Sequence, residues 1–254
     1  MISMFRPRFF ISPIFLSLIL TCANATAQSQ RSTQLLVVTT SSWDAVQGKL
    51  QRYERAKPRG RWQLVGQPIS VVVGKSGLGW GLGLRSVHAA SSPIKKEGDG
   101  RAPAGIFRLS ATFGYATTQP AAWKMPYIAV TPSVECVDDS HSKFYNRIVD
   151  RATVSPDWNS SEHMLLADER YRWGIVVDHN AAHHAHPAIP GSGSCIFLHI
   201  WLNPETSTVG CTAMTQKDIE EVLAWLDPSR SPTLVQLPEP QYKSLRKPWK
   251  LPLQ

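Results

Sequence analysis

The most informative stretch of the sequence is GSCIFLHIWLNPETSTVGCTAM, residues 193–214. Residues 196–201 alternate so that His199 shares one face with two aromatic side chains, which is typical of a β-strand. A loop through Pro204 then returns the chain to Gly210 and Cys211. A rigidly held histidine and a cysteine in a turn are the base and the nucleophile of thiol acyl transfer. This stretch therefore predicts an enzyme with Cys211 as nucleophile and His199 as its base.

The residues that follow Cys211 predict a reactive thiol. Thr215 and Asp218 form a capping box, and an apolar face follows it as far as Pro228, made of Ile219, Val222, Leu223 and Leu226. We expect Cys211 to lie near the N-terminus of this helix, where the dipole stabilises a thiolate. A protonated histidine beside it would lower the thiol pKa from about 8.5 towards roughly 4 to 7.

Thr208 and Gly210 complete this predicted site. A glycine before the cysteine lets backbone amides turn toward a developing oxyanion, so we expect the amides of Gly210 and Cys211 to serve it. Thr208 is expected to support the loop. Taken singly, Cys211 and His199 have a plainer interpretation as buried core residues, and only their combination points to catalysis.

Short β-type runs dominate the rest of the chain, separated by clusters of glycine, proline and aspartate. Residues 43–54 are predicted as a helix, because Trp43, Val46, Leu50 and Tyr53 recur at helical spacing. The sequence thus predicts a mostly β fold with a few helices, a sandwich or a barrel. The expected strands lie at residues 62–65, 69–73, 105–109, 126–130, 174–177, 196–201 and 233–237.

The predicted domain covers residues 28–237. Before it, Arg6 and Arg8 precede a short apolar run and a small-residue site ending at Ala27, which is typical of a cleaved signal peptide over residues 1–27. The apolar run is shorter than the roughly 20 residues of a membrane span. We therefore expect a secreted or periplasmic protein that keeps no membrane span after cleavage.

The C-terminal segment, residues 238–254, is basic and holds several prolines, so it is predicted to be an extended or loose tail. The whole chain carries a formal charge of +8, which suits an anionic envelope as well as it suits an ordinary basic domain. Lysine and arginine are scattered outside the tail, which argues against a nucleic-acid-binding module. A monomer without a cofactor is expected.

The order of these residues resembles the L,D-transpeptidase catalytic domain (YkuD-type) family, whose members carry a histidine on a strand, a loop and a [ST]-x-G-C signature. His199 and TVGC, residues 208–211, match that pattern. Upstream, GDGRAPAGIF, residues 98–107, resembles the family's stretch before a core strand. The resemblance covers roughly residues 35–237 and is that of a divergent branch. Val209 and Ala213 stand where the family usually has a histidine and an arginine or other polar residue, and the loop after His199 is short.

The resemblance implies that Cys211 attacks the peptide bond between an L-centre and a terminal D-amino acid in a peptidoglycan stem peptide. D-Alanine leaves, a thioester forms, and an amine or water then takes the acyl group, with His199 moving the proton. The implied partner is the stem peptide, and the implied activity is transpeptidase, carboxypeptidase or endopeptidase. Since Ala213 replaces the usual polar residue, the family's donor and acceptor preferences are not carried over.

Two other functions fit parts of the sequence. His179, His183, His184 and His186 could hold a zinc ion in an envelope hydrolase. The H-E-x-x-H glutamate is missing, and prolines and glycines follow directly, so we expect no metal there but an exposed loop near the cleft, with His179 on the substrate side. A non-catalytic wall-binding module is the third reading, although it gives the nucleophile no purpose.

Three cysteines remain after signal cleavage, and in an oxidising compartment an odd number leaves one thiol unpaired. If Cys211 is the nucleophile, Cys136 and Cys195 are the remaining pair. Their disulfide would stabilise the fold by roughly 3 to 4 kcal/mol on the chain-entropy model, and it would hold the strand that carries His199. Two separate buried thiols are the alternative.

Overall fold

A computed structural model describes residues 31–85, 91–182 and 187–254 of the chain. The predicted signal peptide, residues 1–27, lies outside the described residues, as do His183, His184 and His186. Within the described ranges, no helix combines the length and the apolar character that crossing a membrane requires.

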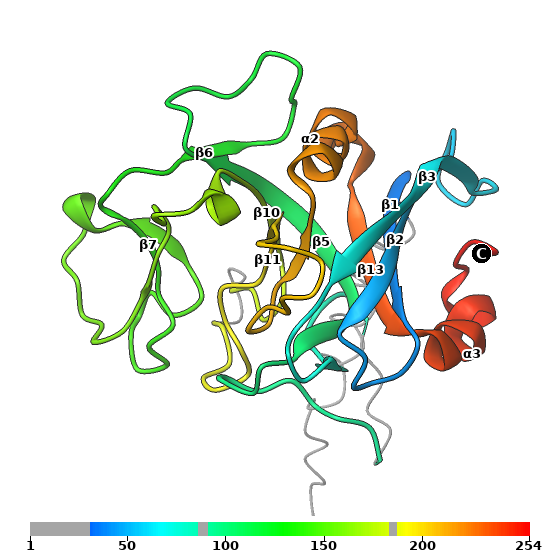
Figure 1. Ribbon diagram of the computed structural model, residues 1–254, viewed down its shortest axis with the longest axis horizontal. Coiled ribbons are helices and arrows are strands. Elements are labelled where there is room, and N and C mark those ends of the chain that lie inside the picture. The colour runs from blue at the N-terminus through cyan, green and yellow to red at the C-terminus, as the bar shows by residue number, and fades with distance from the viewer. Residues whose placement is uncertain (1–30, 86–90, 183–186) are drawn as a thin grey trace, which may run out of the picture.

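Ten strands form one sheet at the centre of the molecule (Figure 1), with the order β10-β11-β12-β3-β2-β1-β13-β5-β4 and with β6 paired to β5. A further pairing between β10 and β5 closes the sheet into a barrel, so the mostly β prediction is confirmed. The strands are β1 (Gln34–Thr40), β2 (Gln47–Glu54), β3 (Gln63–Val72), β4 (Leu78–Trp80), β5 (Ala102–Gly114), β6 (Tyr127–Ala129), β10 (Trp173–Val177), β11 (Phe197–Ile200), β12 (Thr212–Met214) and β13 (Thr233–Pro238).

A glycine allows the barrel to close where β10 meets β5. Gly174 pairs with Phe113, and any side chain at Gly174 would collide with the Phe113 ring. That ring packs edge-on against Tyr171 and Phe197, with ring centroids 5.5 and 5.0 Å away. The closure of the barrel thereby places a cluster of three packed aromatic rings at β11, the strand that carries His199.

The strand β1 forms the middle of the sheet and was not among the predicted runs. All seven of its residues are buried, between β2 on one side and β13 on the other. Its neighbour β2 overturns the helix predicted for residues 43–54, because Gln47–Glu54 is a strand paired along its length with β1 and β3. Leu50 and Tyr53 are buried, as helical spacing also required, so the apolar pattern alone did not separate the two structures.

The late helix is confirmed as α2 (Gln216–Trp225). Thr215 is its N-cap, and its side chain accepts a hydrogen bond from the backbone N–H of Asp218, as a capping residue does. Ile219, Val222 and Leu223 are buried, so the predicted apolar face is the one that packs against the sheet.

The predicted loose tail is wrong, since residues Glu239–Trp249 form the helix α3. Pro240 lies in the first turn, where a missing N–H costs nothing, and Pro248 lies in the last turn. Tyr242 is buried and its hydroxyl donates a hydrogen bond to the carbonyl of Pro252, while Leu251 joins the core. The prolines were therefore compatible with a helix because of where they fall in it.

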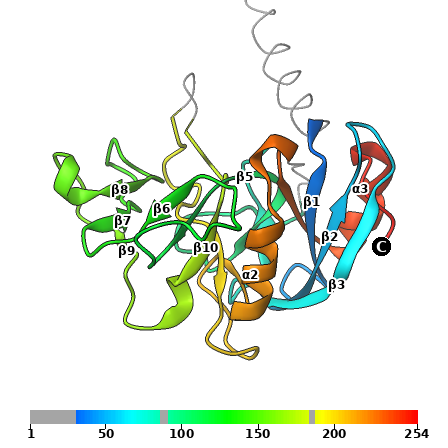
Figure 2. The same cartoon turned by 90° about the horizontal axis from the view of Figure 1, so that it is seen from above.

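A second, three-stranded sheet lies beside the barrel in the order β8-β7-β9. From above (Figure 2), this small sheet occupies one end of the molecule and α3 the other, with α2 between them. The strands are β7 (Val134–Cys136), β8 (Ile148–Asp150) and β9 (Glu162–His163). The chain also has three short 3₁₀ turns: η1 (Arg151–Thr153) after β8, η2 (Glu169–Tyr171) after β9, and η3 (Pro228–Arg230) after α2.

Candidate active site

Two adjacent parallel strands bring His199 and Cys211 together. On β11 and β12, His199 is the register partner of Ala213, and Cys211 stands two residues before Ala213. Since residues two apart share a face of a strand, all three lie on one side of the sheet. Strand spacing and rise place the Cα atoms of His199 and Cys211 roughly 8 Å apart, diagonally across the pair. Both side chains line one cleft with a volume of about 100 Å³.

His199 is oriented by its own strand. Among the residues that the structure describes, the one group at hydrogen-bond distance from Nδ1 is the carbonyl oxygen of Ile200, at 2.8 Å. A carbonyl can only accept, so Nδ1 carries the proton and Nε2 carries the lone pair. Within the described residues no hydrogen bond reaches Nε2. The ring packs edge-on against Tyr171 at 5.2 Å, and burial lowers the pKa of His199 to about 4, so the imidazole is neutral near pH 7.

Cys211 is buried as well, and its thiol is neutral in the resting protein. Burial, with a smaller contribution from the charge of Glu162, raises the pKa of Cys211 to about 12. The backbone N–H of Phe197 points at Sγ from 3.3 Å. The prediction of a thiol pKa between 4 and 7 is therefore wrong, because desolvation disfavours the thiolate and the neutral His199 gives it no charge to pair with.

The helix dipole does not reach the thiol either. The strand β12 stands between Cys211 and α2, and three strand residues cover roughly 10 Å. The influence of a helix terminus falls off within its first turn. The expected thiolate stabilisation from α2 is thus absent, because the chain between them is extended.

Thr208 holds the loop that presents Cys211. Its hydroxyl donates to the carbonyl of Cys211 over 2.6 Å and accepts from the N–H of Gly210 over 3.1 Å. Backbone bonds to Val73 and Lys75 anchor the same residue to the end of β3. Since the Gly210 amide already has a partner in Thr208, it is not available to an oxyanion, contrary to the expectation from the sequence. The amide of Cys211 remains the candidate donor.

Three further side chains enter the cleft from outside the predicted motif. Glu162 comes from β9, and Arg170 and Tyr171 come from η2. Each lies at least 28 residues before His199 in the chain, and no local pattern marks these residues, so sequence reasoning missed them. The cleft is also lined by Leu202 and Val209, which are more than half exposed and add apolar surface to it.

His179 was expected on the substrate side of the cleft, but the structure buries it away from the substrate. Its side chain is 1 % exposed, and both ring nitrogens are bonded to backbone. The N–H of Leu82 donates to Nδ1 at 3.1 Å, and Nε2 donates to the carbonyl of Ser192 at 2.8 Å. Since both nitrogens are committed, His179 could ligate a metal only by losing one of these bonds. Among the described residues, no group of three His, Cys, Asp or Glu side chains is arranged to hold a metal ion.

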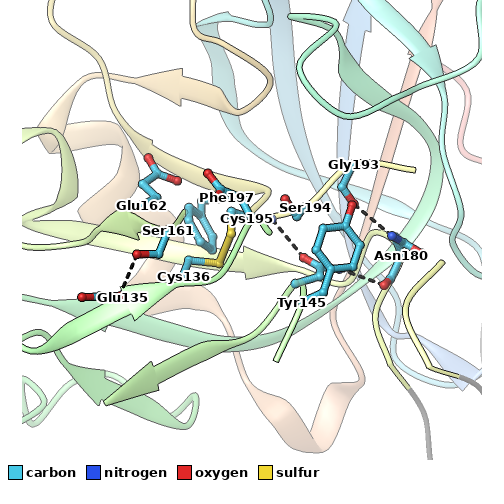
Figure 3. Close-up of a disulfide and its surroundings, with 12 residues drawn as sticks. Glu135, Cys136, Tyr145, Ser161, Glu162, Asn180, Gly193, Ser194, Cys195 and Phe197 are labelled. Atoms are coloured by element: carbon cyan, nitrogen blue, oxygen red, sulfur yellow. Dashed lines mark hydrogen bonds between the residues drawn. A yellow bond between two sulfur atoms is a disulfide. The ribbon is translucent and has the colours of Figure 1, made fainter. Parts of the chain in front are cut away.

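A disulfide joins Cys136 on β7 to Cys195, two residues before β11 (Figure 3). Cys211 is the free cysteine of the described residues. In β7 and β9, Cys136 is the register partner of Glu162. The disulfide ties β7 to the residues just before β11, which carries His199, and β9 with Glu162 pairs with β7, so two walls of the cleft are linked through this bond.

Comparison with known proteins gives one match. The family model described as YkuD, L,D-transpeptidase catalytic domain, matches residues 43–235, a span that includes both His199 and Cys211. No curated protein and no solved structure matches the chain.

Proposed function

The chain belongs to the L,D-transpeptidase catalytic domain family, and from this premise we propose that it performs acyl transfer on peptidoglycan stem peptides through a thioester on Cys211. The observation that carries the proposal is the pair formed by His199 and Cys211 on adjacent strands. A thiol and an imidazole with a free Nε2 lone pair line one cleft. These are the nucleophile and the base that a thioester mechanism needs.

Because both groups are neutral at rest, the thiol proton moves as the bond forms. Nε2 of His199 takes the proton from Cys211, and Sγ attacks the carbonyl carbon of the scissile peptide bond. The electron pair of the carbonyl moves to its oxygen, for which the Cys211 amide is the candidate donor. When the tetrahedral adduct collapses, the C–N bond breaks, and the leaving amine receives the proton from the His199 imidazolium.

The second half of the reaction returns the enzyme to its starting state. An amine, or water, attacks the thioester carbonyl and gives a proton to Nε2 of His199. The C–S bond then breaks, and the thiolate of Cys211 takes that proton back. An amine acceptor makes the reaction a transpeptidation, and water makes it a carboxypeptidase or endopeptidase reaction.

An exported location fits this proposal. The disulfide between Cys136 and Cys195 is a bond that persists in oxidising compartments such as the periplasm or the cell exterior. Residues 1–27 have the pattern of a signal peptide. Peptidoglycan lies in the same compartment, so enzyme and substrate would meet there.

The test is mass spectrometry of muropeptides incubated with residues 28–254. The wild-type protein is expected to release D-alanine or to form cross-linked products. The Cys211→Ser variant should form none while keeping its melting temperature, and Ser244→Ala, an exposed change on α3, should behave as wild type. Iodoacetamide should label Cys211 and stop product formation together. Full activity in Cys211→Ser would rule out the thioester.

A further inference from the structure

Glu162 places a carboxylate in the cleft beside the nucleophile, and the reaction described above gives it no role. It lies on β9, partly buried, and it lines the same cleft as His199 and Cys211. Its register partner on β7 is Cys136, whose disulfide to Cys195 lies beside Glu162 (Figure 3), so the disulfide fixes the strand against which β9 pairs. Strand pairing therefore fixes the backbone position of Glu162 beside the cleft.

The carboxylate is only half satisfied. The hydroxyl of Tyr171 donates to Oε1 over 2.5 Å, while Oε2 has no hydrogen-bond or ion-pair partner in the described parts of the chain. Arg170, a neighbouring cation, is engaged by Asp168, with N–O distances of 2.9 and 3.0 Å. Partial burial makes the carboxylate costly to keep charged, and a cation bound at Oε2, which is not sealed from solvent, would offset that cost.

The charges around Glu162 also indicate that its carboxylate lacks a cationic partner. Burial, and then the charge of Asp138, raise the pKa of Glu162, while the Tyr171 hydrogen bond and the charge of Arg170 lower it, and the net direction is upward. From the barrel, Cys211 faces it as a neutral thiol. The carboxylate thus sits among groups that leave it short of positive charge.

Tyr171 connects Glu162 to the nucleophile. The Tyr171 side chain also interacts with Cys211 and lowers the thiol pKa, whereas the charge of Glu162 raises it. A tyrosine hydroxyl has a single proton, and in this structure that proton goes to Glu162. The two residues therefore act on Cys211 in opposite directions.

We propose that Glu162 binds a protonated primary amine of the substrate in the cleft through Oε2, and that this binding removes the negative charge that opposes the Cys211 thiolate. The inference rests on the proposed function, in which the acceptor is an amine: it binds as the ammonium ion and gives one proton to solvent before its nitrogen attacks the thioester. An ammonium group offers three N–H donors and a positive charge, which is what the open carboxylate oxygen lacks. The cleft thereby favours substrates with a free amine near the reacting bond, and it activates the thiol only when such a substrate is bound.

The first experiment measures the rate of Cys211 alkylation by iodoacetamide against pH. Glu162→Gln keeps the shape of the side chain and removes its charge, so the titration should move to lower pH, with a rate roughly tenfold higher at a fixed pH below the midpoint. Tyr171→Phe should move the titration to higher pH. Glu205→Gln, an exposed carboxylate on the loop after β11 that does not line the cleft, is the matched control and should not move it. Shifts of both cleft variants in one direction, or no shift in Glu162→Gln, would overturn the inference.

The second experiment adds the ligand chemistry itself. With n-butylammonium at pH 8, alkylation of wild-type Cys211 should accelerate about as much as it does in Glu162→Gln, and n-butanol at the same concentration should have no effect. Glu162→Gln should not respond to n-butylammonium. Equal responses of the two proteins, or an equal effect of n-butanol, would exclude a specific ammonium site at Glu162.

The third experiment separates this inference from the proposed function. With muropeptide donors, Glu162→Gln should raise the KM for an amine acceptor roughly tenfold or more, as loss of a charged hydrogen bond does, and change kcat much less. An unchanged KM in an active enzyme would remove the ammonium site and leave the thioester. Absence of products from the wild type would remove the proposed reaction, while the two alkylation experiments would still decide whether Glu162 binds an ammonium group.

Discussion

His179 and His199 are two buried histidines of the same barrel, and burial lowers the pKa of each to about 4. They differ in their hydrogen bonds. His179 follows β10 and bonds through both ring nitrogens to the backbone of two loops, at Leu82 and Ser192. Among the described residues, His199 forms a hydrogen bond through Nδ1 alone, to the next residue in its own strand, and its side chain lines the cleft.

This difference shows how one residue type serves two purposes at equal burial. A histidine with both nitrogens committed joins loops and has no lone pair left for chemistry. A histidine with one nitrogen committed has a fixed tautomer and a free lone pair. The tautomers are opposite, since His179 carries its proton on Nε2 and His199 carries it on Nδ1. The comparison therefore predicts that stability depends more on His179 and activity more on His199.

The largest expected effect is on activity in His199→Ala. Turnover of muropeptides should fall by about 10² to 10⁴, the usual contribution of a general base. The melting temperature should change less than in the matching His179 variant, because the hydrogen bond lost is local to one strand. An unchanged rate would mean that another group accepts the thiol proton.

The next effect is on stability in His179→Ala. The substitution leaves the Leu82 N–H and the Ser192 carbonyl without their partner and opens a cavity, so the free energy of unfolding should fall by about 3 kcal/mol. Urea unfolding of wild type, His179→Ala and His179→Gln would measure it, with His179→Gln intermediate. Below the melting temperature, turnover per folded molecule should stay within a few-fold of wild type. Loss of activity like that of His199→Ala would break the comparison.

A smaller effect concerns acid. Both folded pKa values, about 4, lie below the ordinary value of 6.5, so folding favours the neutral rings. Their contribution is complete above pH 6.5 and is lost as the pH falls through 4, to the extent of about 3 kcal/mol per histidine. Urea unfolding at pH values from 7 to 4 should show this loss, and His179→Gln should lose stability less steeply. A pH-independent stability over that range would contradict the two buried neutral rings.

The smallest expected effect is that of a chelator. If His179 is a structural residue and His199 the base, EDTA should leave turnover unchanged, and the purified protein should contain less than one equivalent of zinc. Measurement of activity with EDTA, then with added zinc, checks this. Activity lost to EDTA and restored by zinc would instead favour the hydrolase hypothesis based on the histidine-rich loop.

Much of the fold was predictable from local sequence patterns, and the errors in the prediction have identifiable causes. The helix α2 was predicted because its cap and its apolar face are set by residues three and four apart. Residues 43–54 have the same spacing but form β2, because two neighbouring strands satisfy its backbone. Pairing with distant strands overrode the local preference there. The C-terminal helix α3 was missed because its prolines were counted without regard to their place in the turns.

The sequence by itself determined which residues could react: a cysteine after a glycine, a histidine on a strand, and the Thr208 that braces their loop. Those statements depend on residue types and short spacings, which the chain carries without folding. Only the tertiary structure decided the protonation states, because the pKa values of Cys211 and His199 depend on burial by distant segments. It alone also brought Glu162 and Tyr171 to the thiol, since β9 and η2 reach the cleft only when the barrel closes and the disulfide joins the small sheet to β11.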